Sequence, residues 1–256
     1  AVFYPTIYTK EAIFRQEGWH YKLESKDAPL EYNGVVYNEM KGAFSSPEQQ
    51  LFRAILNSLF PDTAYSVESG GDPEVIPDLT YEAFLDFHRK YYHPSNSYIY
   101  LYGDIDVEEK LNWIDENYLQ NFDHDFVDSK IELQEPFPKL RQIEQEYSLS
   151  EDEEVKDNTY LSYNMVLGLS LDIETSMAMQ ILEYVLLSAP GAPLKQALID
   201  AGIGKDILSS YDSDTYQTTL SIIAKNSEKE KKDEFLQIIK ETLEQIIEDG
   251  LDLKSL

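Results

Sequence analysis

Strand-like and helix-like segments alternate along this chain, and this alternation constrains the fold more than any other feature. In the second half, strand patterns cover residues 142–149, 159–167, 204–213 and 216–225. Two helix patterns lie between the two strand pairs, and a long charged amphipathic helix covers residues 227–249. The order β-β-α-α-β-β-α predicts an antiparallel sheet with helices packed on one face. We therefore predict an α+β fold.

The first half repeats the alternation. Helix patterns cover residues 9–18, 47–59, 79–88 and 106–118, and strand patterns cover residues 19–24 and 97–104. From residue 121 to residue 139 the helical pattern lapses, and Pro136 and Pro138 close a mixed acidic stretch. Such breaks are typical of domain linkers. We therefore predict two domains, residues 1–139 and residues 140–256.

The charge of the chain argues against two classes of partner. Its formal net charge is -27 and its pI is about 4.3, so its field repels the phosphates of nucleic acids and anionic membranes. Cationic peptides suit this charge, although solubility alone also explains it. Without cysteine, the chain has no disulfide or thiolate site. No apolar run reaches the roughly 20 residues of a spanning helix, so we expect a soluble protein of undetermined compartment.

Glu39 is the candidate site residue. It lies in a short helix pattern that begins after Asn33-Gly34 and carries Val36, Tyr37 and Met40 on or near an apolar face. Glu39 falls at the edge of that face. An acid in this position is either a solvated helix residue or a carboxylate directed into a cleft, and the pattern alone favours the solvated alternative because buried acids are rare.

The four histidines do not form a recognisable metal motif. His88 and His93 are five residues apart, which is not a helical spacing that brings two ligands to one metal, and neither His-x-x-Glu-His nor His-Glu-x-x-His occurs. We interpret His20, His88, His93 and His124 as structural. No serine or threonine lies in a nucleophile-elbow context. We therefore assign no catalytic residue within this chain and leave substrate-binding residues unknown.

Several sequence blocks resemble one family in the order in which they occur. They are EGWHY (17–21), GVVYNEMKG (34–42), YSVESGGDP (65–73), FHRKYYHPSN (87–96), SAPGAPL (188–194) and AGIG (201–204). Together they resemble the presequence protease and falcilysin branch of the pitrilysin/insulinase family of zinc metallopeptidases. The resemblance implies two similar metallopeptidase-type domains, with residues 1–139 as the later part of the zinc-site domain and residues 140–256 as most of a non-catalytic one.

The resemblance also implies a role for Glu39. In that family an inverted His-x-x-Glu-His motif supplies two histidine ligands and a general base, and Glu39 matches the later glutamate that completes the zinc site. A three-ligand site leaves zinc an open position for water. The inverted motif would lie upstream of Ala1, and a second half that closes a chamber would lie beyond Leu256. We therefore expect a piece of a longer protein that binds zinc weakly or not at all and is inactive alone.

Two classes of function stay open. One is a zinc endopeptidase that degrades unstructured peptides in a closed chamber, of which this chain is a part. The other is a non-catalytic peptide-binding or structural subunit of the same fold, in which the metal motif has decayed. A ligand paired along an exposed strand edge is compatible with either. The sequence upstream of Ala1 discriminates between the endopeptidase and the non-catalytic subunit. Separately, an exposed sheet edge in the incomplete first domain would promote dimerisation.

Overall fold

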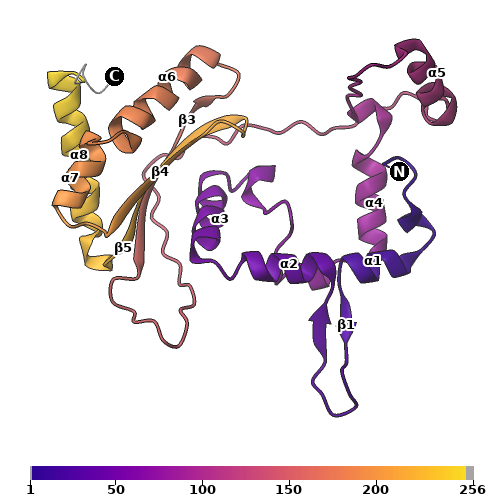
Figure 1. Ribbon diagram of the computed structural model, residues 1–256, viewed down its shortest axis with the longest axis horizontal. Helices are drawn as coiled ribbons and strands as arrows, with labels where there is room; N and C mark the ends of the chain where they lie inside the picture. Colours follow the sequence, from indigo (N-terminus) through magenta and orange to yellow (C-terminus); the bar gives the residue numbers. More distant parts are fainter. Residues whose placement is uncertain (1, 252–256) are drawn as a thin grey trace. The chain divides into compact units, whose positions relative to one another are not determined.

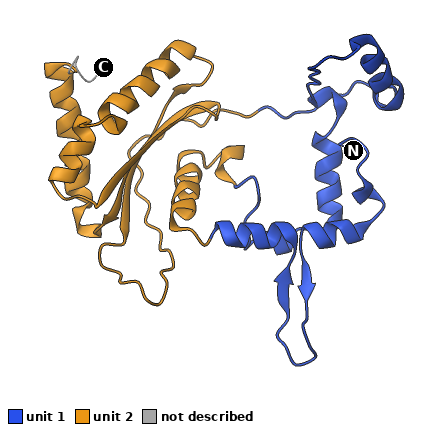
Figure 2. Cartoon of the chain, viewed as in Figure 1, with its two compact units in different colours: residues 1–44, 68–130 blue, residues 45–67, 131–256 orange. Residues whose placement is uncertain are grey.

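The computed structural model describes residues 2–251, which form two compact units (Figure 2). Unit 1 comprises residues 1–44 and 68–130, and unit 2 comprises residues 45–67 and 131–256. The predicted boundary after residue 139 concerns the domains of a longer protein and stays a prediction. The compact units divide differently because residues 45–67 pack with the second half of the chain.

Unit 1 is built from short helices and one antiparallel hairpin. Its elements are α1 (Glu11–Glu17), β1 (His20–Lys22), β2 (Glu31–Asn33), α2 (Val35–Ala43), α4 (Tyr81–Tyr91) and α5 (Val107–Asn117), with 3-10 turns at Thr6–Tyr8, Ile76–Asp78, Pro94–Asn96 and Leu119–Asn121 (Figure 1). Phe14, Trp19, Tyr37 and Ile76 form its buried cluster. This small core lies where α1, the hairpin and α2 meet.

Unit 2 contains a three-stranded antiparallel sheet with β5 in the centre, in the order β3-β5-β4. Its elements are α3 (Pro47–Leu59), β3 (Thr159–Leu169), α6 (Ile173–Glu183), a π-helical turn (Tyr184–Ser188), α7 (Pro193–Asp200), β4 (Asp206–Asp212), β5 (Gln217–Ser227) and α8 (Lys232–Asp249), with 3-10 turns at Ala64–Ser66 and Lys229–Lys231. The predicted class, α+β with antiparallel sheets, is therefore confirmed.

Both faces of this sheet are covered by helices of unit 2. On one face, Ile222 of β5 is buried in a cluster with Leu198 of α7 and Phe235 of α8. On the other face, Ile223 is buried in a cluster with Ile55 of α3 (Figure 1). Successive strand residues point to opposite faces, so a central strand covered on both sides is buried along its length, as residues 218–224 of β5 are. The sequence predicted helices on one face of the sheet, and α3 forms a further layer on the other face.

Local capping signals placed several helices correctly. Ser46 Oγ accepts from the Gln49 amide at 3.5 Å, and Thr80 Oγ1 accepts from the Ala83 amide at 3.1 Å. Asp106 and Asp172 cap α5 and α6 in the same way. These side chains satisfy amides that have no partner within the helix. The predicted helix starts near residues 47, 80 and 106 are therefore confirmed, and Asp172 begins the first of the two helices predicted between the strand pairs.

Two predicted strands, at residues 97–104 and 142–149, were wrong. Neither segment is paired in the described part of the chain, and Tyr98, Tyr100 and Tyr102 are almost fully exposed. The alternating pattern gives a segment the capacity to form a strand, but a strand exists only when a neighbour pairs with its backbone. Within residues 2–251, no helix is long and apolar enough to cross a membrane.

Candidate functional site

Glu39 lies on the exposed side of α2. The opposite side of the helix is packed into unit 1, because Tyr37 is only 9% exposed and Met40 packs against the same cluster. Val36, predicted on the apolar side, is 37% exposed and lies one turn before Glu39. The structure therefore presents the Glu39 carboxylate outward, beside an apolar surface on the same helix.

The start of α2 is fixed against the base of the hairpin. Gly34 precedes the helix with φ +149°, and a Cβ atom there would lie 2.2 Å from the Gly18 carbonyl oxygen. The Tyr37 amide donates to that same oxygen at 3.3 Å. The Asn38 side-chain amide donates to Asn33 Oδ1 at 2.7 Å. Only glycine permits this approach of two backbone segments, so the Asn33-Gly34 pair sets the direction of the helix.

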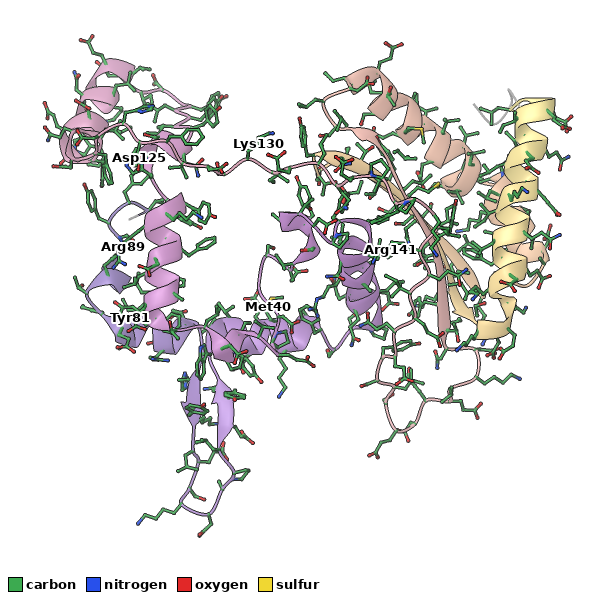
Figure 3. The ribbon with its side chains drawn as sticks, turned by 180° about the vertical axis from the view of Figure 1, so that it is seen from behind. Met40, Tyr81, Arg89, Asp125, Lys130 and Arg141 are labelled. Atoms are coloured by element: carbon green, nitrogen blue, oxygen red, sulfur yellow. The ribbon has the colours of Figure 1, made fainter. Side chains whose placement is uncertain are left out.

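The buried side of α2 is held by a second glycine-dependent contact. Met40 projects from α2 in Figure 3, and a Cβ atom added to Gly70 would lie 2.4 Å from the Met40 sulfur. The next residue, Gly71, has φ +92°. The Gly70-Gly71 turn therefore passes directly over Met40 and fixes the helix from the side opposite Glu39. Two of the matched sequence blocks, residues 34–42 and 65–73, meet at this contact.

The described residues do not provide a complete zinc site. Between residues 2 and 251, no group of three or more His, Cys, Asp or Glu side chains is placed to hold a metal ion. Glu39 is exposed and offers one carboxylate, whereas zinc sites in proteins need three or four ligands. The residues present therefore do not fit a bound zinc ion by themselves, and no catalytic step is assigned to them.

Three of the four histidines hold the local structure together. His20 Nδ1 donates to the Arg15 carbonyl at 2.7 Å, and its Nε2 accepts from Asn33 at 3.2 Å. His88 Nε2 donates to the Val2 carbonyl at 3.0 Å, and its Nδ1 accepts from the Tyr8 hydroxyl at 2.7 Å. The carbonyl partners fix which nitrogen carries the proton.

His93 acts differently and His124 lies apart from these contacts. His93 Nδ1 accepts from the Ser95 amide at 3.2 Å and so caps the following 3-10 turn. His124 is exposed. The contacts of His20, His88 and His93 agree with their interpretation as structural residues, and no contact tests that interpretation for His124. Within residues 2–251 the structure does not bring the histidines together with Glu39 as a ligand group.

A charged network in unit 2 was not predicted from the sequence. Glu48 Oε1, in the first turn of α3, accepts from Lys225 Nζ at 2.5 Å and from the Tyr160 hydroxyl at 2.9 Å. The hydrogen bond from Lys225 is the main reason that the pKa of Glu48 falls to about 2. Burial, with the nearby carboxylate, raises the pKa of Tyr160 to about 12. The network connects α3 to β3 and β5, and no short sequence spacing reveals it.

The antiparallel sheet layered between helices defines an α+β domain. The chain belongs to the peptidase M16 family, because the family model described as "Peptidase M16 inactive domain" matches residues 78–256. The family resemblance of the sequence blocks is therefore confirmed. The region that carries Glu39 lies before the matched residues.

Curated relatives match almost the entire chain. It is 48% identical to "Protein HypA" of Clostridium perfringens, over 98% of this chain and 26% of that protein. It is 38% identical to "Presequence protease 1, chloroplastic/mitochondrial" of Arabidopsis thaliana, over 98% of this chain and 24% of that protein. The chain thus spans about a quarter of the length of these relatives.

Solved structures show the same fold at lower sequence identity. An M16-like peptidase from Alicyclobacillus acidocaldarius matches with a TM-score of 0.51 and 20% identity, over 86% of this chain and 51% of that one. A protease from Helicobacter pylori matches with a TM-score of 0.53 and 19% identity, over 86% and 53% of the two chains. These similarities support the α+β peptidase fold and do not extend to a particular activity.

Proposed function

We propose that this chain is part of a zinc-dependent endopeptidase that degrades unstructured peptides, and that Glu39 supplies one metal ligand. The observation that carries this proposal is the placement of Glu39 on the outward side of a helix whose other side is fixed. The other ligands and the general base come from residues outside this chain. Membership of the M16 family and relatives named as presequence proteases support this assignment.

The surroundings of Glu39 suit a ligand that meets a second element. Metal ligands work best on rigid elements, because a small loss of position weakens the site. α2 is rigid by this criterion, since Gly34 fixes its start and Met40 fixes its buried side. The exposed Val35 and Val36 provide apolar surface beside the carboxylate. An incoming helix or strand that carries histidines would cover this surface and bring its ligands to Glu39.

The first test measures zinc binding by this chain alone. Isothermal titration with zinc chloride should show no tight stoichiometric site, because one carboxylate cannot complete the coordination. The same preparation should not cleave an unstructured peptide in a chelator-sensitive reaction. Tight one-to-one binding, or cleavage that a chelator abolishes, would show that the described residues form a site by themselves and would contradict this part of the proposal.

The second test examines Glu39 in the full-length protein. Glu39→Gln keeps the size of the side chain and removes its charge, so zinc affinity should fall at least about 10- to 100-fold, the loss typical of disturbing residues that support a zinc site. Metal content after dialysis is the readout, and it does not depend on activity. Glu116→Gln, an exposed change on α5, is the matched control and should retain full zinc content. Unchanged zinc content in Glu39→Gln would rule out Glu39 as a ligand.

A non-catalytic subunit of the same fold is the alternative proposal. It is favoured by one specific observation, the match of residues 78–256 to the inactive-domain model of the family. The sequence that precedes Ala1 in the full-length protein separates the two. An intact His-x-x-Glu-His motif supports the endopeptidase, whereas a motif lacking either histidine or the glutamate supports a peptide-binding or structural subunit.

The closed chamber and the preference for cationic peptides belong to the same proposal. The net charge of -27 attracts basic peptides over a distance set by the salt concentration. An unstructured basic peptide should therefore be degraded faster by the full-length protein than a neutral peptide of equal length, and the difference should shrink as salt is added. Equal rates at low salt would remove the charge preference from the proposal.

A further inference from the structure

The hairpin of unit 1 has two chemically different faces. Its register pairs His20 with Asn33, Tyr21 with Tyr32, and Lys22 with Glu31. Because strand residues alternate between faces, the first and third pairs place polar side chains on one face. The middle pair places two tyrosines on the other face, next to Trp19. The hairpin therefore has a polar face and an aromatic face, and it extends from the junction of α1 and α2 (Figure 1).

The aromatic face is buried at its base and open at its outer part. The ring centroids of Tyr21 and Tyr32 lie 5.4 Å apart, and Trp19 lies edge-on at 5.4 Å from Tyr21 and 5.8 Å from Tyr32. Trp19 is 8% exposed, whereas Tyr21 is 57% and Tyr32 is 45% exposed. We call Tyr21 and Tyr32 the tyrosine pair. It is a preformed aromatic surface, because Trp19 is fixed by a 2.9 Å hydrogen bond from its Nε1 to the Leu79 carbonyl.

A carboxylate belongs to the segment that binds Trp19 at the base of the tyrosine pair. Asp78 is exposed and directly precedes Leu79, whose carbonyl binds Trp19. The pKa of Tyr32 is raised, first by the neighbouring Tyr21 and to a smaller extent by burial and by the negative charge of Asp78. Leu79 binds the Trp19 indole, and that indole contacts both Tyr21 and Tyr32, so chain connectivity places Asp78 at the same aromatic cluster. Two aromatic faces next to a carboxylate are a combination that attracts a cationic side chain.

The same cluster already holds one cation of the chain. The guanidinium of Arg15 lies 5.7 Å from the Trp19 ring centroid and 5.3 Å from that of Phe14. Arg15 also forms a 2.8 Å ion pair with Glu11. An arginine held by an aromatic ring and a carboxylate is thus present at the base of the cluster. The outer part offers the same two components, the tyrosine pair and Asp78, to a cation from another molecule.

We propose that the tyrosine pair and Asp78 form a binding site for arginine or lysine side chains of a basic peptide. The net charge of -27 supplies long-range attraction for such a ligand, and cation–π contact supplies the local recognition. The inference rests on the proposed function, since it names a substrate class and a place where substrate is held. It requires neither zinc nor cleavage, so the two can be tested apart.

The test measures peptide binding to the 256-residue chain without added metal. The probe is a fluorescein-labelled 12-residue peptide, (Arg-Ser-Ala)4. The control peptide carries citrulline in place of each arginine, which preserves the shape of the side chain and removes its charge. Fluorescence anisotropy at about 0.15 M salt gives the affinities. We expect the citrulline peptide to bind at least about 10-fold more weakly, since it loses both cation–π contact and the attraction to the acidic chain.

Substitutions locate the site. Tyr21→Leu and Tyr32→Leu keep apolar surface but remove the aromatic face, and each should weaken binding of the arginine peptide about 3- to 5-fold, the range for an exposed cation–π contact. Asp78→Asn should weaken it about 2- to 4-fold. Tyr102→Leu is the matched control, because Tyr102 is 88% exposed and lies outside the hairpin. It should bind as the unchanged chain does.

Each of the following three outcomes would overturn the proposal. Equal affinities for Tyr21→Leu, Tyr32→Leu and Tyr102→Leu would show that only the overall charge attracts the peptide. Equal binding of the citrulline peptide would show an apolar docking face instead of a cation site. Self-association that Tyr21→Leu abolishes in sedimentation would show that a second copy covers the face. Far-UV circular dichroism verifies folding of each variant, and Tyr21→Leu alone suffices if Tyr32→Leu does not fold.

Discussion

At the scale of single residues, the position of Glu39 depends on side chains and glycines that do not contact its carboxylate. Gly34 allows the backbone of α2 to approach Gly18, and Tyr37 anchors the helix in the cluster of unit 1. The family resemblance singled out Glu39 without these contacts. The structure explains how the surrounding block, residues 34–42, holds that position.

Gly34→Ala should destabilise unit 1 by at least about 2 kcal/mol, because it combines a strained backbone with a steric clash. The new Cβ would lie 2.2 Å from the Gly18 oxygen and 2.7 Å from the Trp19 Cα, at φ +149°. Urea unfolding followed by tryptophan fluorescence measures the change.

Gly42→Ala on the same helix is the matched control for this substitution. A Cβ at Gly42 meets no atom within 4 Å, so the change should be neutral or stabilising by up to about 1 kcal/mol. Similar losses from both substitutions would show that helix propensity, and not the contact with Gly18, governs this site.

At the scale of elements, α3 is attached to the sheet of unit 2 by apolar packing and by one charged network. Ile55, Leu59 and Phe60 pack against the face of the sheet that includes Ile223. Glu48 adds its hydrogen bonds to Lys225 and Tyr160 at the start of the helix. The side chains of Glu48 and Lys225 remain about a third exposed. The network should therefore contribute less than a fully buried ion pair would.

Glu48→Gln should lower the stability of unit 2 at pH 7 by about 1 to 2 kcal/mol, after allowance for solvent screening. The pKa of Glu48 is about 2 in the folded chain and about 4.3 in an unfolded one. A depressed folded pKa stabilises the fold above the unfolded pKa, and this contribution is lost as pH falls from about 4.3 to about 2. Urea unfolding at pH 7, 4 and 2 should show the two chains converging.

Glu174→Gln is the matched control for Glu48→Gln. Glu174 lies in unit 2 and occupies the same second position of α6 as Glu48 does of α3, so it shares the contribution of the helix dipole, but it is exposed. Its replacement should change stability by less than about 0.5 kcal/mol. A deficit in Glu48→Gln that persisted unchanged at pH 2 would show that lost packing, and not the charge, is responsible.

Raising the pH tests the contribution of the Tyr160 hydroxyl to the same network. The pKa of Tyr160 is about 12 in the folded chain and about 10 when unfolded. A raised pKa gives a contribution that is present below pH 10 and is lost as pH rises toward 12. Wild-type unit 2 should therefore lose more stability than Tyr160→Phe between pH 9 and pH 11, as measured by urea midpoints. A parallel decline of both chains would contradict the assignment.

At the scale of the whole molecule, the two units differ in the size of their cores. Unit 2 has a cluster of eleven buried residues and a second cluster of four, whereas the cluster described in unit 1 has four. Buried apolar area is the main source of folding free energy. Unit 1 should therefore be the less stable unit, and the chain should not unfold as one cooperative body.

Both tryptophans, Trp19 and Trp113, lie in unit 1. Tryptophan fluorescence therefore reports unit 1, while far-UV circular dichroism reports both units. The fluorescence midpoint in urea should come first. Ile222→Ala, at a side chain 1% exposed in unit 2, should lower the later transition by about 2 to 5 kcal/mol and leave the fluorescence transition in place. Coincident midpoints, shifted together by Ile222→Ala, would show one cooperative unit.

The sequence by itself determined the helices, the β3, β4 and β5 strands, the α+β class and the family. Capping residues such as Thr80 and Asp106 act on amides two or three positions away, so their information is local. Strand alternation is also local. The resemblance of the sequence blocks to the family then identified Glu39 as a candidate ligand position, which remains a prediction.

Only the tertiary structure decided which of the locally predicted helices and strands form. Residues 97–104 have the pattern of a strand, yet no described segment pairs with them, because pairing depends on a distant partner. Glu48 and Lys225 are 177 positions apart, and α3 covers a sheet formed from the second half of the chain. The tyrosine pair likewise depends on strand register. No regular spacing in the sequence marks a contact between distant segments, so such contacts can be located only in the folded structure.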